Sequence, residues 1–143
     1  MPETYDNNNI FAKILRGEAP CVKVFEDEVA LAFMDIMPRA EGHVLVIPKA
    51  PARNIFDIAP SDLARLAPTL QRVAIGVKTA MNAEGLTIQQ FNESAGGQIV
   101  FHLHFHVLAR WAGVALRPPG GPIVKAEALA PIAAQIAAAI GGG

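Results

Sequence analysis

The chain has 143 residues, of which 52% are hydrophobic and 17% are charged, and its formal net charge at pH 7 is −1. These values predict one soluble domain over residues 1–143 with a sizeable core. A charge this close to zero gives no electrostatic footprint for nucleic acid or for an anionic membrane, so the sequence argues against both partners.

The N-terminal tail and the cysteine content bear on where the protein resides. Residues 1–9 lack the basic region and apolar run of a signal peptide, and no stretch of about 20 apolar residues predicts a membrane span. Cys21 is the only cysteine, which excludes an internal disulfide and a Cys-x-x-Cys site. We therefore expect a reducing, cytoplasmic location.

The first predicted element is a short helix over residues 10–16. Asn9 is a favourable N-cap, and Gly17 is a favourable residue at the end of the helix. Three apolar side chains share one face of this helix and pack on a core or line a pocket: Ile10, Phe11 and Ile14.

A β-hairpin is predicted next, with alternating residues 22–25 as its first strand and residues 29–35 as its second. Asp35 closes the apolar run, just before a loop that contains Pro38. Its carboxylate either caps that loop or accepts hydrogen bonds from the two vicinal hydroxyls of a sugar. From the residues alone, capping is the more common outcome.

A buried strand over residues 43–48 and a long helix follow. His43 begins this strand, where a single histidine is usually structural. Ser61 is the predicted N-cap of the long helix, which contains Pro68 and ends before Gly85. Its apolar residues recur at helical spacing and form a core stripe: Leu63, Leu66, Leu70, Val73, Val77 and Met81.

The most informative stretch alternates histidines with apolar residues. It follows a predicted strand over residues 86–91 and a loop over 92–97. Alternation is the period of a half-buried strand, so His102, His104 and His106 should line one face, about 6.6–6.8 Å apart. The opposite face should pack on the core through Leu103, Phe105 and Val107.

Three interpretations fit three histidines on one strand face. They form an ordinary exposed polar face, a metal site, or a nucleophilic imidazole with imidazole helpers. A metal site is disfavoured because His102 and His106 start about 13 Å apart at strand rise, whereas ligand atoms lie about 2.0–2.1 Å from a zinc ion. The nucleophile is the preferred interpretation.

The stretch resembles the signature His-x-His-x-His-x-x of the histidine-triad (HIT) superfamily of nucleotide hydrolases and transferases. The loop over residues 92–98 resembles the family's lead-in, and residues 33–36 and 42–49 resemble its upstream blocks. The likeness runs from about residue 10 to about residue 120. It is most similar to the Hint-type purine nucleoside phosphoramidase branch.

The resemblance implies roles for the four histidines and for the residues around them. His104 would be the nucleophile that forms a nucleotidyl-histidine, His106 would bind a phosphate oxygen, and His102 with His43 would complete a hydrogen-bonding relay. Asp35 would hold the ribose of a purine nucleotide. The phosphate and the leaving group would be bound by Asn92, Gly97, Gln98 and Ile99. The base would lie among Ile10, Phe11, Ile14, Phe33 and Ile36.

Two departures from the family pattern affect these expectations. Many bacterial relatives bind a structural zinc through Cys-x-x-Cys and a histidine, but those places hold Asn9, Ala12 and Pro51 here. We therefore predict no metal and no cofactor. Ile99 stands where several relatives have serine or threonine, so a hydroxyl contact to phosphate is missing and the substrate preference stays open.

The last part of the chain completes the predicted fold. Residues 111–122 are rich in glycine and proline and form a loop, and residues 125–140 form an alanine-rich amphipathic helix. The fold class is α+β: an antiparallel five-stranded sheet with one long helix, a short N-terminal helix and a C-terminal helix. The HIT core spans about residues 9–120, residues 121–143 follow it, and the resemblance implies a homodimer.

The predicted activity is metal-independent hydrolysis of nucleoside 5'-phosphoramidates of the AMP-amine type. One alternative is hydrolysis of dinucleoside polyphosphates on the same fold. Others are a nucleotide-binding regulatory module with weak turnover and a metal-dependent enzyme. The residues do not identify the leaving group.

Overall fold

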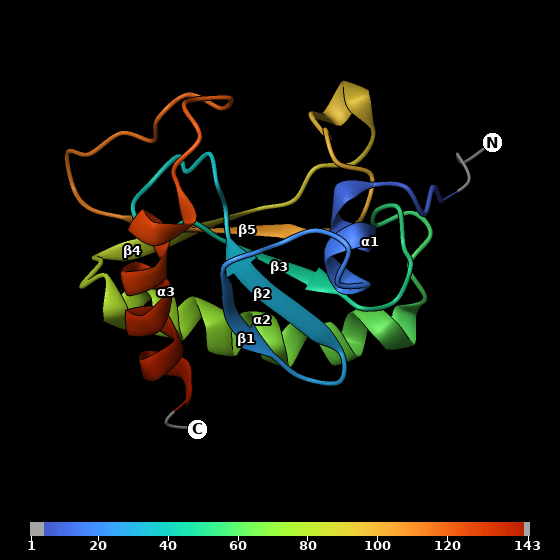
Figure 1. Cartoon of the computed structure of the whole chain (residues 1–143), viewed down its shortest axis with the longest axis horizontal. Coiled ribbons are helices and arrows are strands. Elements are labelled where there is room, and N and C mark those ends of the chain that lie inside the picture. The colour runs from blue at the N-terminus through green and yellow to red at the C-terminus, as the bar shows by residue number, and fades with distance from the viewer. Residues whose placement is uncertain (1–4, 142–143) are drawn as a thin grey trace.

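The computed structural model describes residues 5–141 and has the predicted α+β fold. A five-stranded antiparallel sheet carries three helices and one short 3-10 helix, η1 (Figure 1). None of the helices in the described part is long and apolar enough to cross a membrane. The elements in chain order are α1 (Ile10–Leu15), β1 (Lys23–Glu26), β2 (Ala30–Met34), β3 (Val44–Pro48), α2 (Pro60–Ala80), β4 (Gly85–Gln89), η1 (Ser94–Gly96), β5 (Phe105–Arg110) and α3 (Ala126–Gly141).

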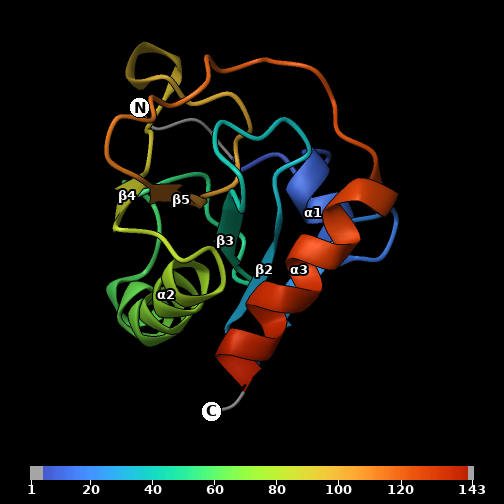
Figure 2. The same cartoon turned by 90° about the vertical axis from the view of Figure 1, so that its left-hand side faces the viewer.

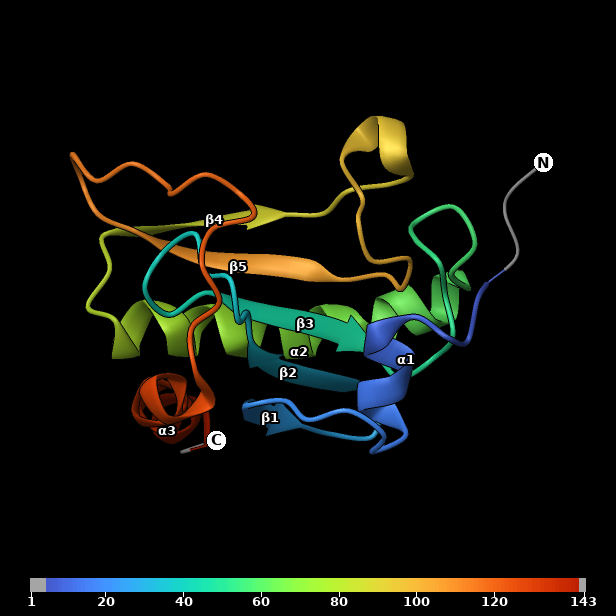
Figure 3. The same cartoon turned by 45° about the horizontal axis from the view of Figure 1, so that its top comes forward.

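The strands lie side by side in the order β1-β2-β3-β5-β4, and every pair is antiparallel (Figure 3). Because α2 and β4 lie between them in sequence, β3 and β5 become neighbours only through tertiary structure. Leu45 of β3 pairs with His106, and Gln89 of β4 pairs with the same histidine. This register places His106 between two strands, inside the sheet.

One face of the sheet is covered by α2 and α3, which pack against each other (Figure 2). Alternate strand residues point into this core, as a period of two requires. Gly76 of α2 allows the close approach of α3, because a Cβ there would lie 2.3 Å from Cγ1 of Ile140. The fully buried members of the core include Val44, Val46, Leu66, Val73, Val77, Val107 and Ile136.

The other face carries a smaller apolar cluster under α1. The intervening strand residues point this way, and Phe11 of α1 packs on them. The cluster covers β2 and part of β3, and the histidines lie beside it. Its buried members are Phe11, Leu31, Phe33, Leu45 and Ile47.

The predicted histidine strand is shorter than expected. β5 begins at Phe105, so His106 alone lies in regular strand, whereas His102 and His104 precede it. The main-chain N–H of Leu103 donates to the carbonyl of Ala52 (2.8 Å). This bond ties the segment to the loop after β3 instead of extending the β3–β5 ladder.

Helix boundaries also differ from the prediction. The long helix has Ala59 as its N-cap and Pro60 in its first turn, not Ser61 as the N-cap. Proline is favoured there because its missing N–H is one that a helix start leaves unpaired in any case. Pro68 lies inside the helix near its N-terminal end, and the helix ends at Ala80.

Candidate active site

The four histidines of the chain converge beside α1, although they come from different elements. His43, His102 and His104 are buried and His106 is half-buried. The rings of His104 and His106 lie edge to face with their centroids 5.0 Å apart, and the rings of His43 and His106 lie 5.2 Å apart. Imidazoles that are buried or half-buried require hydrogen-bond partners, and these partners define the site.

His104 has the geometry of a nucleophile. Its Nδ1–H donates to the carbonyl oxygen of His102 (2.7 Å), and no described residue bonds its Nε2. The rings of Phe11 and His104 lie edge to face, with their centroids 5.0 Å apart. Burial lowers the pKa of His104 below its ordinary value, which keeps the ring neutral at pH 7. Its Nε2 lone pair is therefore available.

His102 is held by bonds at both ring nitrogens. Its Nε2 lies 2.8 Å from the carbonyl oxygen of Pro48, which can only accept, so Nε2 carries the proton. Nδ1 is then an acceptor, and it takes the Tyr5 hydroxyl proton at 2.5 Å. Burial lowers the pKa of His102 to about 4. His102 thus fixes the carbonyl on which His104 depends.

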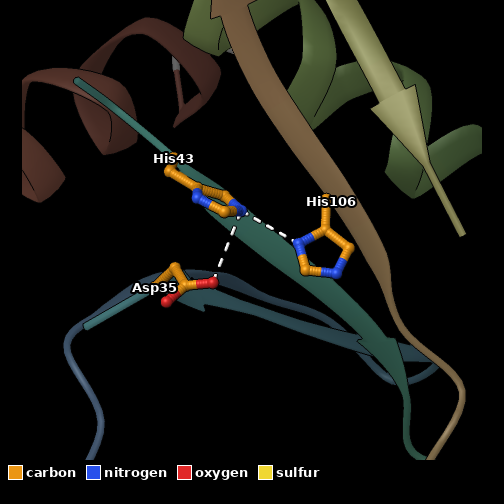
Figure 4. Close-up of side chains that lie close together, drawn as sticks. All are labelled: Asp35, His43 and His106. Carbon is orange, nitrogen blue, oxygen red and sulfur yellow. Dashed lines mark hydrogen bonds and ion pairs between the residues drawn. The ribbon is translucent and has the colours of Figure 1, made fainter. Parts of the chain in front are cut away.

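A separate relay joins Arg39 to His43 and His106, and Figure 4 shows the two histidines of this relay with Asp35. The main-chain N–H of Arg39 donates to Nδ1 of His43 (3.0 Å), so the His43 proton is on Nε2. That Nε2–H faces Nδ1 of His106 at 3.0 Å, which leaves the His106 proton on its own Nε2. Burial lowers the pKa of His43 to about 3 and that of His106 to about 4.

The resemblance implies one relay that includes both His43 and His102, whereas the hydrogen bonds place these two histidines in separate chains of bonds. His43 bonds His106, and the bonds of His102 go to Tyr5 and Pro48. The reason is the sheet register, which sets His106 opposite Leu45, two residues after His43. The relay ends in a donor, His106 Nε2–H, on a ring whose centroid lies 5.0 Å from that of His104.

Asp35 takes the capping role, and its second carboxylate oxygen lies beside the histidines. Its Oδ1 accepts from the main-chain N–H of Met37 (2.8 Å), which caps the loop, while Oδ2 lies 3.4 Å from Nε2 of His43. Burial raises the pKa of the Asp35 carboxyl above its usual range. The carboxylate lies at the edge of the histidine cluster.

A metal ion fits this cluster poorly. Asp35, His43 and His106 offer ligand atoms within 4.8 Å of one another, the one such group of three or more in residues 5–141. To ligate, Nε2 of His43 must lose its proton. The proton would move to Nδ1, where it would face the Arg39 N–H that now donates there. The hydrogen bonds favour a proton relay over a metal centre.

The five predicted base-pocket residues divide into a floor and a rim. Phe11 and Phe33 are buried with their ring centroids 5.4 Å apart, and Ile14 packs on their cluster. Ile10 and Ile36 are each 46% exposed. Phe11 lies beside His104, and the exposed side chains of Ile10 and Ile36 offer apolar surface on which a flat ring system could pack.

The loop between β4 and β5 is held by a buried amide network. Gln98 is 4% exposed, and its Nε2 donates to the carbonyls of Arg53 and Val100. Its Oε1 accepts from Asn54 Nδ2 and from the Glu93 main-chain N–H. All four of its hydrogen bonds are thus made inside the protein. The predicted role of Gln98 as a donor to phosphate does not fit this arrangement.

The other predicted phosphate residues show mixed placements. The Asn92 side chain bonds Ile55 N–H and Gln90. Gly97 has φ +95°, a conformation that favours glycine, and its Cβ position is 3.4 Å from the Phe91 ring. The Ile99 side chain is 81% exposed. The main-chain N–H groups of Gly96, Gly97 and Gln98 donate to the carbonyls of Glu93 and Ser94, so hydrogen bonds within the loop fix its shape.

Sequence reasoning missed several residues that shape the site. Glu93 has φ 64° and bonds Arg53 through two contacts (2.8 and 2.9 Å) and Asn54. These bonds, first the one from Arg53, lower the pKa of Glu93 to about 2. Glu93 lies in the lead-in loop over residues 92–98, so its position in that motif could have marked it as a site residue. Tyr5 and Arg39 offered none, because their bonds to the histidines follow no sequence spacing.

Comparisons with known proteins give one matching family and a set of relatives. The HIT domain family profile matches residues 16–113. Adenylylsulfatase HINT3 of Arabidopsis thaliana is 32% identical over 120 residues, 80% of this chain, and this chain spans 61% of its length. Adenosine 5'-monophosphoramidase hnt1 of Schizosaccharomyces pombe is 37% identical over 71% of this chain and 73% of its own.

Among solved structures, a HIT-like protein from Bartonella henselae, described as involved in cell-cycle regulation, superposes with a TM-score of 0.89. It is 48% identical in sequence and covers 95% of this chain and 99% of its own. The likeness therefore extends over the sheet and all three helices.

Proposed function

This chain belongs to the HIT domain family, and from that premise we propose that it is a nucleotide hydrolase that cleaves nucleoside 5'-phosphoramidates of the AMP-amine type. One observation carries the proposal. The Nε2 of His104 bonds no described residue, its Nδ1–H is fixed on a carbonyl, and the ring of His106, which carries an Nε2–H, lies 5.0 Å away between centroids. Two relatives whose names state an activity, an adenosine 5'-monophosphoramidase and an adenylylsulfatase, support the reaction class.

In the first step, Nε2 of His104 attacks phosphorus in line with the leaving amine. The Nε2–P bond forms, the P–N bond breaks, and its electron pair stays on the amine nitrogen. His106 Nε2–H donates a hydrogen bond that orients the leaving nitrogen, and the amine takes up its proton from solvent water, because a neutral imidazole does not give up its N–H proton. The nucleotidylated imidazole is then cationic, and its Nδ1–H keeps its bond to the His102 carbonyl, which stabilises that charge.

In the second step, water attacks the phosphorus and the Nε2–P bond breaks. The attacking water loses its proton to the solvent, and His106 keeps its own. AMP leaves, and His104 is again a neutral imidazole. No step in this sequence needs a metal ion or a cofactor.

The nucleoside would be bound by the surfaces beside the histidines. Its purine would lie on Phe11 and Phe33, between the open side chains of Ile10 and Ile36, with Ile14 behind them. Asp35 Oδ2 would accept from the ribose hydroxyls. Neutral, apolar walls favour a base and do not select adenine over guanine.

Steady-state turnover of an AMP-amine phosphoramidate in EDTA tests the proposal, with diadenosine polyphosphates as competing substrates. We expect phosphoramidate cleavage that EDTA does not reduce. His104→Ala should lose at least about 10³-fold in kcat while it still binds AMP, because the covalent step is removed and the pocket is kept. Lys78→Ala, on the exposed side of α2, is the control.

Other outcomes would redirect the proposal. Preference for the dinucleotide would assign a dinucleoside polyphosphate hydrolase with the same residues. Binding of AMP without turnover of either substrate would assign a regulatory module. Full activity of His104→Ala would show that the nucleophile is a different residue.

We also propose that the protein is a cytoplasmic homodimer. β4 is an edge strand with its free side available, and exposed Ile88 lies on it. Light scattering after size exclusion tests the dimer, and a monomer at micromolar concentration would contradict it.

A further inference from the structure

A cleft of about 350 Å³ lies beyond the histidine cluster, at the far end of β5. It is formed by the loop after β2, the end of β5 and the segment that follows β5. Its lining carries three arginines and one glutamate, although the chain as a whole is nearly neutral. The residues that matter here are Arg39, Glu41, Arg110, Trp111 and Arg117.

The three arginines have no carboxylate partner within residues 5–141. Arg39 donates through Nε to the Arg117 carbonyl (2.9 Å) and through Nη1 to Gln89 (3.2 Å). Arg110 donates through Nη1 to the Thr87 hydroxyl (3.0 Å). Arg117 reaches only the Pro38 carbonyl, at 3.5 Å. These neutral acceptors orient the guanidinium groups without neutralising them.

Arg110 also contains a buried donor with no partner. Its Nε is the one side-chain nitrogen or oxygen in the described residues that is buried and makes no hydrogen bond. Buried donors are normally paired with protein, water or an ion. Arg110 and two further arginines line one cleft, and no described carboxylate offsets their charge, which points to an anionic ligand there.

We infer that this cleft binds a small phosphate-type anion that carries at least two negative charges, such as pyrophosphate. A guanidinium group can donate two parallel hydrogen bonds to the oxygens of a phosphate. Because the groups that orient these arginines are uncharged, the positive charge stays available to the ligand. The volume lies at the small end of the range for ligand pockets. Glu41 is exposed at the rim and does not bond any of the three arginines.

The cleft is distinct from the nucleotide site but shares one residue with it. The Arg39 side chain lines the cleft, whereas its main-chain N–H bonds His43. Arg110 and Arg117 have no contact with the histidines among the hydrogen bonds described. These two arginines can therefore be changed without altering the proposed catalytic groups.

Trp111 provides a direct probe, because it is the only tryptophan of the chain and lines the cleft. Its fluorescence is titrated with pyrophosphate at constant ionic strength, with sodium chloride as the baseline, and the heat of binding is measured in parallel. We expect a saturable change that chloride does not produce. Arg117→Gln should weaken binding about tenfold or more, since it removes a charge-assisted bond.

Two further variants separate charge from folding. Arg117→Lys keeps the charge and should retain more of the affinity than Arg117→Gln, and both should keep the wild-type circular dichroism. Arg65→Gln, an exposed position on α2, should bind as the wild type does. No saturable change in fluorescence and no heat would overturn the inference. Equal binding by Arg117→Gln and Arg65→Gln would overturn it as well.

Discussion

The two faces of the sheet bury their residues in different ways. On the helix face, alternate residues of β2, β3 and β5 pack against α2 and α3, and that core is apolar throughout. On the other face, His43, His102 and His104 are buried beside the α1 cluster, and each has a ring nitrogen bonded to a definite partner.

This difference indicates that the helix face determines the stability of the fold and that the histidine face determines its chemistry. The stability of an apolar core depends on the total volume of its side chains. Such a core tolerates conservative substitutions, because it has no directional bonds to satisfy. A buried imidazole needs the right proton on the right nitrogen, so each of its partners matters individually. We therefore expect substitutions on the helix face to change the free energy of unfolding and substitutions on the histidine face to change kcat.

The largest effect should come from the helix face. Ile136 of α3 is fully buried, so Ile136→Ala should lower the free energy of unfolding by about 2–5 kcal/mol, through lost burial and the cavity that it leaves. Urea denaturation measures this change. Turnover per folded molecule should stay at the wild-type value.

Ile75→Ala is the matched control, because Ile75 lies on α2 and is 59% exposed. Its free energy of unfolding should change by less than about 0.5 kcal/mol. A large loss of kcat in folded Ile136→Ala protein would contradict the separation of the two faces.

Acidification should act through the histidine face. Burial lowers the pKa of all four histidines: that of His43 to about 3, those of His102 and His106 to about 4, and that of His104 below its ordinary value. Below about pH 6.5 the unfolded chain therefore binds protons that the folded chain excludes. The free energy of unfolding should fall as the pH drops from about 6.5 to about 4, by up to about 1.4 kcal/mol per pH unit and histidine.

Urea denaturation across this pH range measures the slope. Ile136→Ala should shift the whole curve and leave its slope unchanged, because no histidine is altered. The Glu93–Arg53 pair should persist throughout, since the pKa of Glu93 is about 2. A stability that stays constant between pH 7 and pH 5 would contradict the neutral, buried histidines.

The sequence predicted the helix face better than the histidine face. Hydrophobic periods of two and of 3.6 residues predict the strands and the apolar stripe of α2, because apolar packing repeats along the chain. The strand through His102 and His104 was wrong, since the bond from Leu103 N–H to Ala52 is a tertiary contact. The Tyr5–His102 bond spans 97 residues, and no local pattern encodes such a distance.

The relay offers a smaller effect that bears on kcat. His43→Gln removes the imidazole that fixes the His106 tautomer, so the donor at His106 Nε2 is no longer assured. We expect kcat for the phosphoramidate to fall about 10–100-fold, with KM nearly unchanged. ¹⁵N NMR of His106 should show mixed tautomers.

Two results would count against this role of His43. One is a wild-type kcat in His43→Gln. The other is a raised KM with an unchanged kcat, which would make His43 part of substrate binding instead of proton positioning.

The smallest predicted effect concerns Tyr5, two links away from the nucleophile. Its hydroxyl donates to His102, whose carbonyl holds Nδ1–H of His104. Tyr5→Phe keeps the ring, whose centroid lies 5.6 Å from that of His102, and removes only this donor. The freed Nδ1 can then be protonated more easily, so the acid limb of the kcat profile should move to higher pH and kcat at pH 7 should fall by a factor of a few. Asn7→Ala, exposed in the same segment, should leave the profile in place. An unshifted profile in Tyr5→Phe would show that the Pro48 carbonyl alone is enough to hold His102.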